Sequence, residues 1–515
     1  MILGRRSFMI GSAALLATPA VAQGRQPVVQ TTLGRIRGTR EGGLAVFRGI
    51  RYGTAARFRA PNAPRVSREI IEAATFGPSA VQRGERYRPQ AEDPLYLNIW
   101  TPETARGRAR PVMVYIHGGA YASGSVADPL NEGRHLAATG DVVVVTINHR
   151  LNALGYLYLA RLDPRFPDSG NAGQLDLILA LKWIRDNIAR FGGDPARVMV
   201  FGQSGGGAKI ATMMGMPAAA GLFHRAATMS GQQVTASGPL NATARARAYM
   251  QAVRTGSVDE LLSLPTQRLV EGLAATDPII GGGVYFGPVL DMKWLTRHPF
   301  WPDANPQSNA IPMILGNTKD ETRGFFGPDH AKLQGLDWSN LAERIAPELR
   351  IDIHPEWVVG EYRRLFPSHT PEQVFFAATT AGRSWRGQVE EADARARAGA
   401  PTWVYQLDFA SPVEPWRGAP HTLDIPLVFG TLDAEGSIAG IGPASRRVSN
   451  TMMRLFTTFA HAGAPDADHF LPSWPRYTLP ERRTMIFDTN TRVESDPRRA
   501  ERELFARVPY IQPGT

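Results

Sequence analysis

At 515 residues, of which 43% are apolar and 20% charged, the chain is long enough to bury a large hydrophobic core. Its 51 glycines and 40 prolines follow no period, which argues against a repeat or low-complexity protein, and the absence of cysteine excludes disulfides, thiolate nucleophiles and cysteine metal sites. The formal charge of +10 comes from scattered arginines with no basic run interleaved with aromatics, so we expect no nucleic-acid partner.

The first 22 residues have the composition of an export signal. Arg5 and Arg6 precede a modest apolar stretch, and an A-x-A cleavage pattern ends at Ala22. The stretch is short and rich in glycine and alanine, so we do not expect it to act as a membrane anchor. We therefore predict a twin-arginine signal peptide over residues 1–22 and a single domain over 23–515. The mature protein is expected to be periplasmic or secreted, without stable membrane insertion.

Several short apolar runs, rich in β-branched residues, are typical of strands buried on both faces of a parallel sheet. They cover residues 111–116, 141–147, 197–201 and 311–315. Between the second and third runs, residues 171–191 have the apolar spacing of a helix. The alternation of strand and helix predicts an α/β fold, in which ligands bind beyond the carboxyl ends of the strands.

A cluster of glycines around one serine follows the run 197–201, and three explanations compete for it: a nucleophile, a phosphate-binding loop or a flexible corner. A phosphate-binding loop would need a lysine directly after Gly207, where Ala208 stands. Gly202, Ser204 and Gly206 instead fit G-x-S-x-G. Chance alone gives that match in about a quarter of chains of this composition. The serine, however, lies between a buried strand and a helix expected to begin with residues 208–214, which favours a strained turn that exposes a nucleophilic serine.

A serine nucleophile needs hydrogen-bond donors for the oxyanion that forms on its substrate. His117, Gly118 and Gly119 directly follow the strand 111–116, in the HGG pattern of a loop whose N–H groups serve this purpose. We expect Gly118, Gly119 and Gly205, the residue after the serine, to donate. His117 is expected to hold the loop geometry and not to act as the catalytic base.

A serine nucleophile also needs a base and an orienting acid, which follow it in the sequence in this type of fold. Asp320 and Glu321 both come just after the strand 311–315, and the pattern alone leaves the choice between them open. Among the histidines that follow, His421 lies on a Gly/Pro loop leading into an apolar segment that could anchor it. The others are His330, His354, His369, His461 and His469.

Taken together, the motifs resemble those of the type B carboxylesterases, a branch of the α/β-hydrolases that includes para-nitrobenzyl esterases and cholinesterases. The resemblance extends over residues 28–507. It is carried in order by residues 46–53, 92–102, 116–125, 142–157, 170–195, 201–207, 222–231 and 316–321. It implies an α/β-hydrolase fold, with a central, mostly parallel twisted sheet flanked by helices, and large insertions forming a substrate gorge.

Carried across residue by residue, the resemblance implies that Ser204 is the nucleophile, Glu321 the acid and His421 the base. Ser230 matches a hydroxyl near the histidine. The resemblance also implies two structural ion pairs: Arg150–Asp176, and Glu92 with an arginine near Arg57.

The chain departs from the family pattern at three positions. Gln203 stands before the nucleophile where a glutamate is usual, which removes a negative charge and predicts a weaker preference for cationic substrates. Pro94 replaces a cysteine, in keeping with a chain without disulfides. Gly84 stands where choline-binding relatives carry a tryptophan, so choline esters are not expected substrates.

The resemblance implies hydrolysis of small to medium, uncharged or non-cationic esters through an acyl-enzyme, without metal or cofactor. The expected partner is a small-molecule ester, and a monomer is favoured. An amidase or carbamate hydrolase with the same triad is the nearer alternative, and a non-catalytic binding protein of this fold the remoter one. The substrate pockets are expected on the insertions 235–280 and 327–382.

Overall fold

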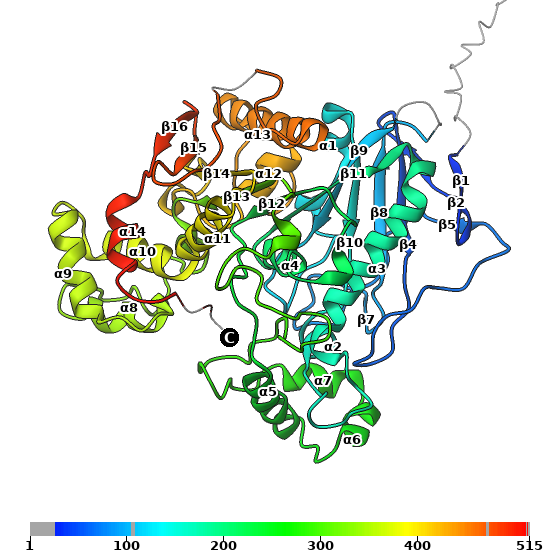
Figure 1. Ribbon diagram of the computed structural model, residues 1–515, viewed down its shortest axis with the longest axis horizontal. Helices are drawn as coiled ribbons and strands as arrows, with labels where there is room; N and C mark the ends of the chain where they lie inside the picture. The colour runs from blue at the N-terminus through cyan, green and yellow to red at the C-terminus, as the bar shows by residue number, and fades with distance from the viewer. Residues whose placement is uncertain (1–25, 105–108, 470–472, 511, 513–515) are drawn as a thin grey trace, which may run out of the picture.

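The computed structural model describes residues 26–104, 109–469, 473–510 and 512, and its centre is a twisted sheet of eleven strands (Figure 1). Strands β9 to β15 are parallel, and antiparallel strands lie at both ends. In sheet order the strands are β16 (Arg492–Ser495), β15 (Arg483–Phe487), β14 (Thr402–Leu407), β13 (Met313–Thr318), β12 (Arg225–Met229), β11 (Gly193–Gln203), β9 (Arg110–Ile116), β10 (Val143–Ile147), β8 (Tyr96–Thr101), β4 (Leu44–Arg51) and β3 (Thr39–Glu41).

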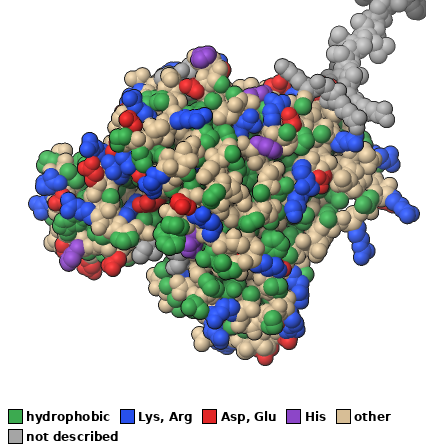
Figure 2. Space-filling view, viewed as in Figure 1, with side chains coloured by type: hydrophobic (Ala, Val, Ile, Leu, Met, Phe, Trp, Pro, Cys, Tyr) green, Lys and Arg blue, Asp and Glu red, His purple; other side chains and the backbone are tan. Residues whose placement is uncertain are grey.

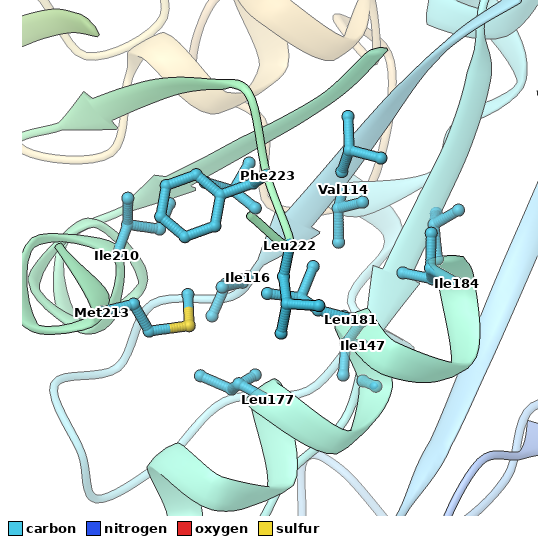
Figure 3. Close-up of a cluster of buried hydrophobic side chains, with 14 of the residues drawn as sticks. Val114, Ile116, Ile147, Leu177, Leu181, Ile184, Ile210, Met213, Leu222 and Phe223 are labelled. Carbon is cyan, nitrogen blue, oxygen red and sulfur yellow. The ribbon is translucent and has the colours of Figure 1, made fainter. Parts of the chain in front are cut away.

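Helices cover both faces of this sheet because successive residues of its central strands point to opposite sides and are buried on both. All seven residues of β9 are buried. One face packs against α3 (Ala172–Asn187), α4 (Gly205–Met213) and α11 (Arg386–Arg397), and Figure 3 shows part of this cluster. The other face packs against α1 (Arg134–Gly140), α12 (Asp424–Phe429) and α13 (Pro443–Ala462). The predicted α/β-hydrolase architecture is thereby confirmed.

The predicted insertions are helical and project from the sheet (Figure 1). The first carries α5 (Pro239–Ala252), α6 (Val258–Ser263) and α7 (Thr266–Gly272), and the second carries α8 (Leu341–Leu349), α9 (Pro355–Leu365), α10 (Pro371–Thr380) and the π-helix Ala381–Trp385. The remaining helices are α2 (Asn152–Tyr156) and α14 (Arg499–Phe505). One small sheet contains β1 (Val28–Thr31), β2 (Gly34–Arg37) and β5 (Ile71–Glu72), and another pairs β6 (Ser79–Ala80) with β7 (Gln90–Ala91). Short 3₁₀ helices cover Pro129–Asn131, Ser169–Asn171, Ile188–Phe191, Pro217–Ala219, Pro306–Ser308, Glu321–Gly324 and Pro415–Arg417.

The predicted strands correspond to β9, β10, β11 and β13, whereas two helix boundaries differ from the prediction. The helix expected over 171–191 ends at Asn187, whose side chain donates to the Trp183 carbonyl at 2.9 Å and competes with the helical hydrogen bonds there. The helix expected from Ala208 begins three residues earlier, at Gly205, because the chain enters it directly from the serine.

The predicted signal segment 1–22 lies outside the described residues. Within the part of the chain that the structure describes, no helix combines the length and apolar character needed to cross a membrane. On the face shown in Figure 2, basic side chains are dispersed and mixed with acidic ones, as expected from the scattered arginines of the sequence.

Candidate active site

Ser204 occupies a sharp turn between β11 and α4. Its φ of 54° and ψ of −124° are strained for a residue with a side chain. The turn requires glycine on its inner side, because a Cβ on Gly206 would lie 1.9 Å from the Ile116 carbonyl oxygen. The backbone N–H of Ser204 donates to the Met229 carbonyl at 2.7 Å, which fixes the turn to β12. The predicted strand–serine–helix geometry is therefore present.

Glu321 and His421 are brought together although they are 100 residues apart in the sequence. Glu321 begins the 3₁₀ turn after β13, and its Oε2 is hydrogen-bonded to Nδ1 of His421. Its Oε1 accepts from Ser230 Oγ at 2.6 Å, from Asn317 Nδ2 at 2.9 Å and from the Thr318 N–H at 2.8 Å. Burial opposes the charge of Glu321, but His421 and the other donors outweigh it and hold the pKa of Glu321 below its usual value.

Asp320, the other acidic candidate, has a different place. Its carboxylate accepts from the Ala419 N–H at 2.9 Å, two residues before His421. Asp320 thus ties down the loop that carries the histidine, whereas Glu321 contacts the imidazole itself. Ser230, expected to place a hydroxyl near the histidine, donates this hydroxyl to the carboxylate of Glu321, which in turn binds the ring.

Gln203 lies between the serine turn and the histidine. Its Nε2 is 3.1 Å from Nε2 of His421, the ring nitrogen opposite the one held by Glu321. An amide nitrogen can only donate, so His421 Nε2 is the acceptor of this hydrogen bond. Among the hydrogen bonds of the described residues, this atom is bound by Gln203 and not by Ser204. The Phe325 ring covers the imidazole at a centroid distance of 4.8 Å.

The HGG loop approaches the serine turn from the end of β9. A Cβ on Gly118 would lie 3.3 Å from Cβ of Ser204 and 2.9 Å from Oε1 of Gln203. Gly119 has a φ of 84°, which favours glycine, and its carbonyl accepts from the Ser123 N–H at 3.0 Å. The backbone of Gly118 therefore lies beside the serine, and Gly119 follows it in a tight turn.

His117 is a buried residue of this loop. Its Nδ1 is hydrogen-bonded to the Gly118 carbonyl at 2.9 Å, and its ring lies 4.7 Å from that of His149. Burial, and secondly the nearby Lys209, lower the pKa of His117 to about 3. His117 is thus neutral near pH 7.

Among the described residues, no group of three or more histidine, aspartate or glutamate side chains could hold a metal ion.

Sequence reasoning missed two polar residues of the site. Asn317 precedes Glu321 by four residues and donates to its carboxylate at 2.9 Å. Lys209 lies in α4 with no exposed surface, and its Nζ donates to the Ala120 carbonyl at 2.7 Å. The available signal for Lys209 was a lysine within an otherwise small and apolar helix, on the turn that follows the serine.

Both ion pairs implied by the resemblance are present. Arg150 Nη2 lies 2.6 Å from Asp176 Oδ1, with both side chains almost fully buried, and this pair joins the end of β10 to α3. Arg57 and Glu92 form a two-pronged pair, with each N–O distance 2.6 Å. Neither pair contacts the serine turn, so their role is to hold the scaffold.

Comparison with known proteins places this geometry in a family. The model of the carboxylesterase family matches residues 25–505. The para-nitrobenzyl esterase of Bacillus subtilis is 34% identical over 92% of this chain and 98% of its own. The phenmedipham hydrolase of Pseudarthrobacter oxydans is 31% identical over 88% of this chain and 93% of its own.

A solved structure agrees with the sequence comparisons. The crystal structure of a Geobacillus stearothermophilus carboxylesterase at pH 6.2 superposes with a TM-score of 0.83. It is 34% identical and covers 92% of this chain and 99% of its own. This chain therefore belongs to the carboxylesterase family and is an enzyme of that class.

Proposed function

We propose that the protein hydrolyses carboxylic esters through an acyl-enzyme formed on Ser204, with His421 as the base and Glu321 as the orienting acid. The observation that carries the proposal is the buried hydrogen bond between Glu321 and His421 Nδ1, which leaves Nε2 of the same ring facing the serine turn. A carboxylate on Nδ1 selects the tautomer whose Nε2 can take a proton, and it stabilises the imidazolium that forms.

The reaction begins when Ser204 Oγ attacks the ester carbonyl carbon and passes its proton to His421 Nε2. Gln203 must yield this nitrogen to the serine hydroxyl, because the imidazole has a single lone pair there. The N–H groups of Gly118, Gly119 and Gly205 receive the oxyanion. The C–O bond then breaks, His421 returns the proton to the leaving alcohol, and water releases the acid by the same steps.

The test of the triad is the Ser204→Ala variant, assayed with a chromogenic short-chain aryl ester. We expect kcat/KM to fall by about 10³-fold or more, because the residual oxyanion hole and binding cannot supply a nucleophile. An unchanged melting temperature would show that the variant is folded. Turnover close to that of the wild type in purified Ser204→Ala enzyme would refute the mechanism.

We further propose that the substrates are small to medium esters without positive charge. Gln203 brings no negative charge to the site, and the guanidinium of Arg383 lies 4.6 Å from the centroid of the Phe325 ring, which itself covers His421. Glu348 pairs with Arg383 at 3.0 Å. Arginine near the imidazole and an amide beside the serine both disfavour cations.

A second candidate function is hydrolysis of an amide or carbamate bond by the same residues. It is supported by the similarity to the phenmedipham hydrolase of Pseudarthrobacter oxydans, whose name does not describe it as an esterase. The two are distinguished with matched ester and amide substrates that share acyl and leaving groups. Comparable kcat/KM for both members of a pair would favour the second candidate, and a loss of several orders of magnitude on the amide would favour the first.

A further inference from the structure

Lys209 is a buried cation for which the proposed mechanism has no role. It has no exposed surface, although lysine is among the residues least often buried without a partner. No carboxylate pairs with it among the described residues, and burial lowers its pKa to about 7. A buried ammonium without a counter-ion destabilises the fold, so packing alone does not account for a lysine at this position.

The hydrogen bond and the cation–π contact of the Lys209 side chain both lead to the loop that follows β9. Its Nζ donates to the Ala120 carbonyl at 2.7 Å and lies 4.8 Å from the centroid of the Tyr121 ring. Both residues directly follow Gly118 and Gly119. The side chain therefore extends from α4, the helix that begins at the nucleophile, to the backbone of the loop that faces it.

A second observation shows how closely the loop is held to α4. A Cβ on Gly205 would lie 1.9 Å from the same Ala120 carbonyl oxygen, far inside van der Waals contact. Glycine at the first position of α4 thus leaves room for this carbonyl, and the lysine one turn later binds it. The carbonyl is fixed from two positions of one helix, and Ala120 itself adopts a strained φ of 55°.

We propose that Lys209 is a positioning residue for ester hydrolysis. Its ammonium holds the Ala120 carbonyl against α4 and so keeps the N–H groups of Gly118 and Gly119 in place beside Ser204. The inference rests on the proposed function of Ser204. The physical reason for its effect is that an oxyanion hole works only when its donors are fixed before the charge develops.

The experiment compares Lys209→Met with the wild type, using active-site titration to count only competent enzyme. Methionine fills a similar volume without a charge or a donor. We expect kcat on an aryl ester to fall by at least about tenfold while KM changes less than about threefold, because the lost interaction acts in the transition state. A trifluoromethyl ketone, which forms an oxyanion on the serine, should lose affinity by a similar factor.

The stability of the same variant separates positioning from a structural role. Lys209→Met removes a desolvated charge, so its melting temperature should equal or exceed that of the wild type even though kcat falls. Lys209→Gln keeps a donor without the charge and should recover part of kcat. Lys182→Met, at an exposed position of α3, is the matched control and should change neither quantity.

Two results would overturn the inference. One is wild-type kcat and ketone affinity in Lys209→Met, and the other is a loss of kcat that merely follows a fall in melting temperature in both Lys209 variants. Failure of the proposed function would look different. In that case Ser204→Ala would keep its activity, whereas an inactive Ser204→Ala beside a fully active Lys209→Met would count against the role of Lys209 alone.

Discussion

At the scale of single residues, Glu321 and Gln203 determine the charge and hydrogen bonding at the two ring nitrogens of His421. Glu321 holds Nδ1 and is itself bound by Ser230, Asn317 and Thr318, so its negative charge is fixed in position. Gln203 holds Nε2 through a neutral amide. A carboxylate at the Gln203 position would instead stabilise the protonated ring, because opposite charges at hydrogen-bond distance favour the charged form.

The Gln203→Glu variant tests this difference. We expect the acidic limb of the kcat/KM profile to move to higher pH by about one unit, because the new carboxylate favours the imidazolium. The ratio of kcat/KM for a cationic ester to that for its neutral isostere should rise, by about three- to tenfold. Gln203→Met, which is neutral, serves as the control and should shift neither. A pH profile and substrate ratio unchanged in Gln203→Glu would contradict the electrostatic role.

Residues differed in how far the sequence could identify them. The serine was fixed by local spacing, since G-x-S-x-G follows a buried strand. The choice of Glu321 over Asp320 could not come from spacing. The two residues are adjacent after the same strand, and only the backbone conformation there decides which side chain points toward His421. The only local signal for Lys209 is a lysine in an otherwise small and apolar helix. Its contact is with a loop 89 residues away, which no local pattern encodes.

At the scale of elements, α4 determines the geometry of both the nucleophile and the loop opposite it. It begins directly after Ser204 with Gly205 and Gly206. A Cβ on Gly205 would lie 1.9 Å from the carbonyl oxygen of Ala120, and a Cβ on Gly206 would lie 1.9 Å from that of Ile116, the last residue of β9. The helix and the HGG loop are therefore packed as one unit. A change in the first turn of α4 must displace the loop.

The Gly205→Ala variant is expected to show this coupling. The new methyl group must push the Ala120 carbonyl away from α4, so we expect kcat to fall by about tenfold or more with a smaller change in KM. Gly238→Ala is a suitable control because a Cβ there meets nothing within 4 Å. Activity assays of both purified variants, with circular dichroism to verify folding, would check the prediction. Equal kcat in the two variants would contradict it.

The elements themselves were predicted well where burial dominates and less well where side chains interfere. Runs of β-branched residues located β9, β10, β11 and β13, because a strand buried on both faces has a simple composition. The end of α3 was placed four residues too late. Its apolar spacing continues to Phe191, but Asn187 diverts the hydrogen bonding and the chain tightens into a 3₁₀ turn.

At the scale of the whole molecule, the buried ammonium of Lys209 makes stability depend on pH. The folded pKa of Lys209 is lowered to about 7, against an ordinary value of 10.5, so between these values the unfolded chain binds more protons than the folded protein. The free energy of unfolding therefore rises as pH increases from about 7 to 10.5. Below about pH 7 the cost of burying the charged ammonium of Lys209 is fully present.

Urea unfolding of the wild type and of Lys209→Met at several pH values would measure this effect. The variant should be more stable below pH 7, by an amount on the order of a few kcal/mol, and its advantage should shrink as pH approaches 10. The groups facing Lys209 are His117, His149 and Tyr121. Burial keeps all three neutral in this range, with the pKa lowered for the histidines and raised for the tyrosine. A difference independent of pH would contradict the assignment.

Export is a second property of the whole molecule, and we propose that it depends on the N-terminal arginines. Replacing both Arg5 and Arg6 with lysine should leave the precursor uncleaved inside the cell, because twin-arginine signals need the arginine pair. Immunoblots of cell fractions would measure this, with a single Arg35→Lys change in the mature chain as the control. Normal cleavage and export of the double variant would count against a twin-arginine signal.

The long sequence separations within the site also bear on how the protein folds. Gln203 and His421 are 218 residues apart, and Glu321 and His421 are 100 apart, so the site closes only after very long loops have closed. Contacts between residues so far apart in the sequence form slowly, and the chain has no disulfide to hold these segments together beforehand. During refolding, enzymatic activity should thus return after helical signal and intrinsic fluorescence, which makes it a sensitive reporter of the final assembly step.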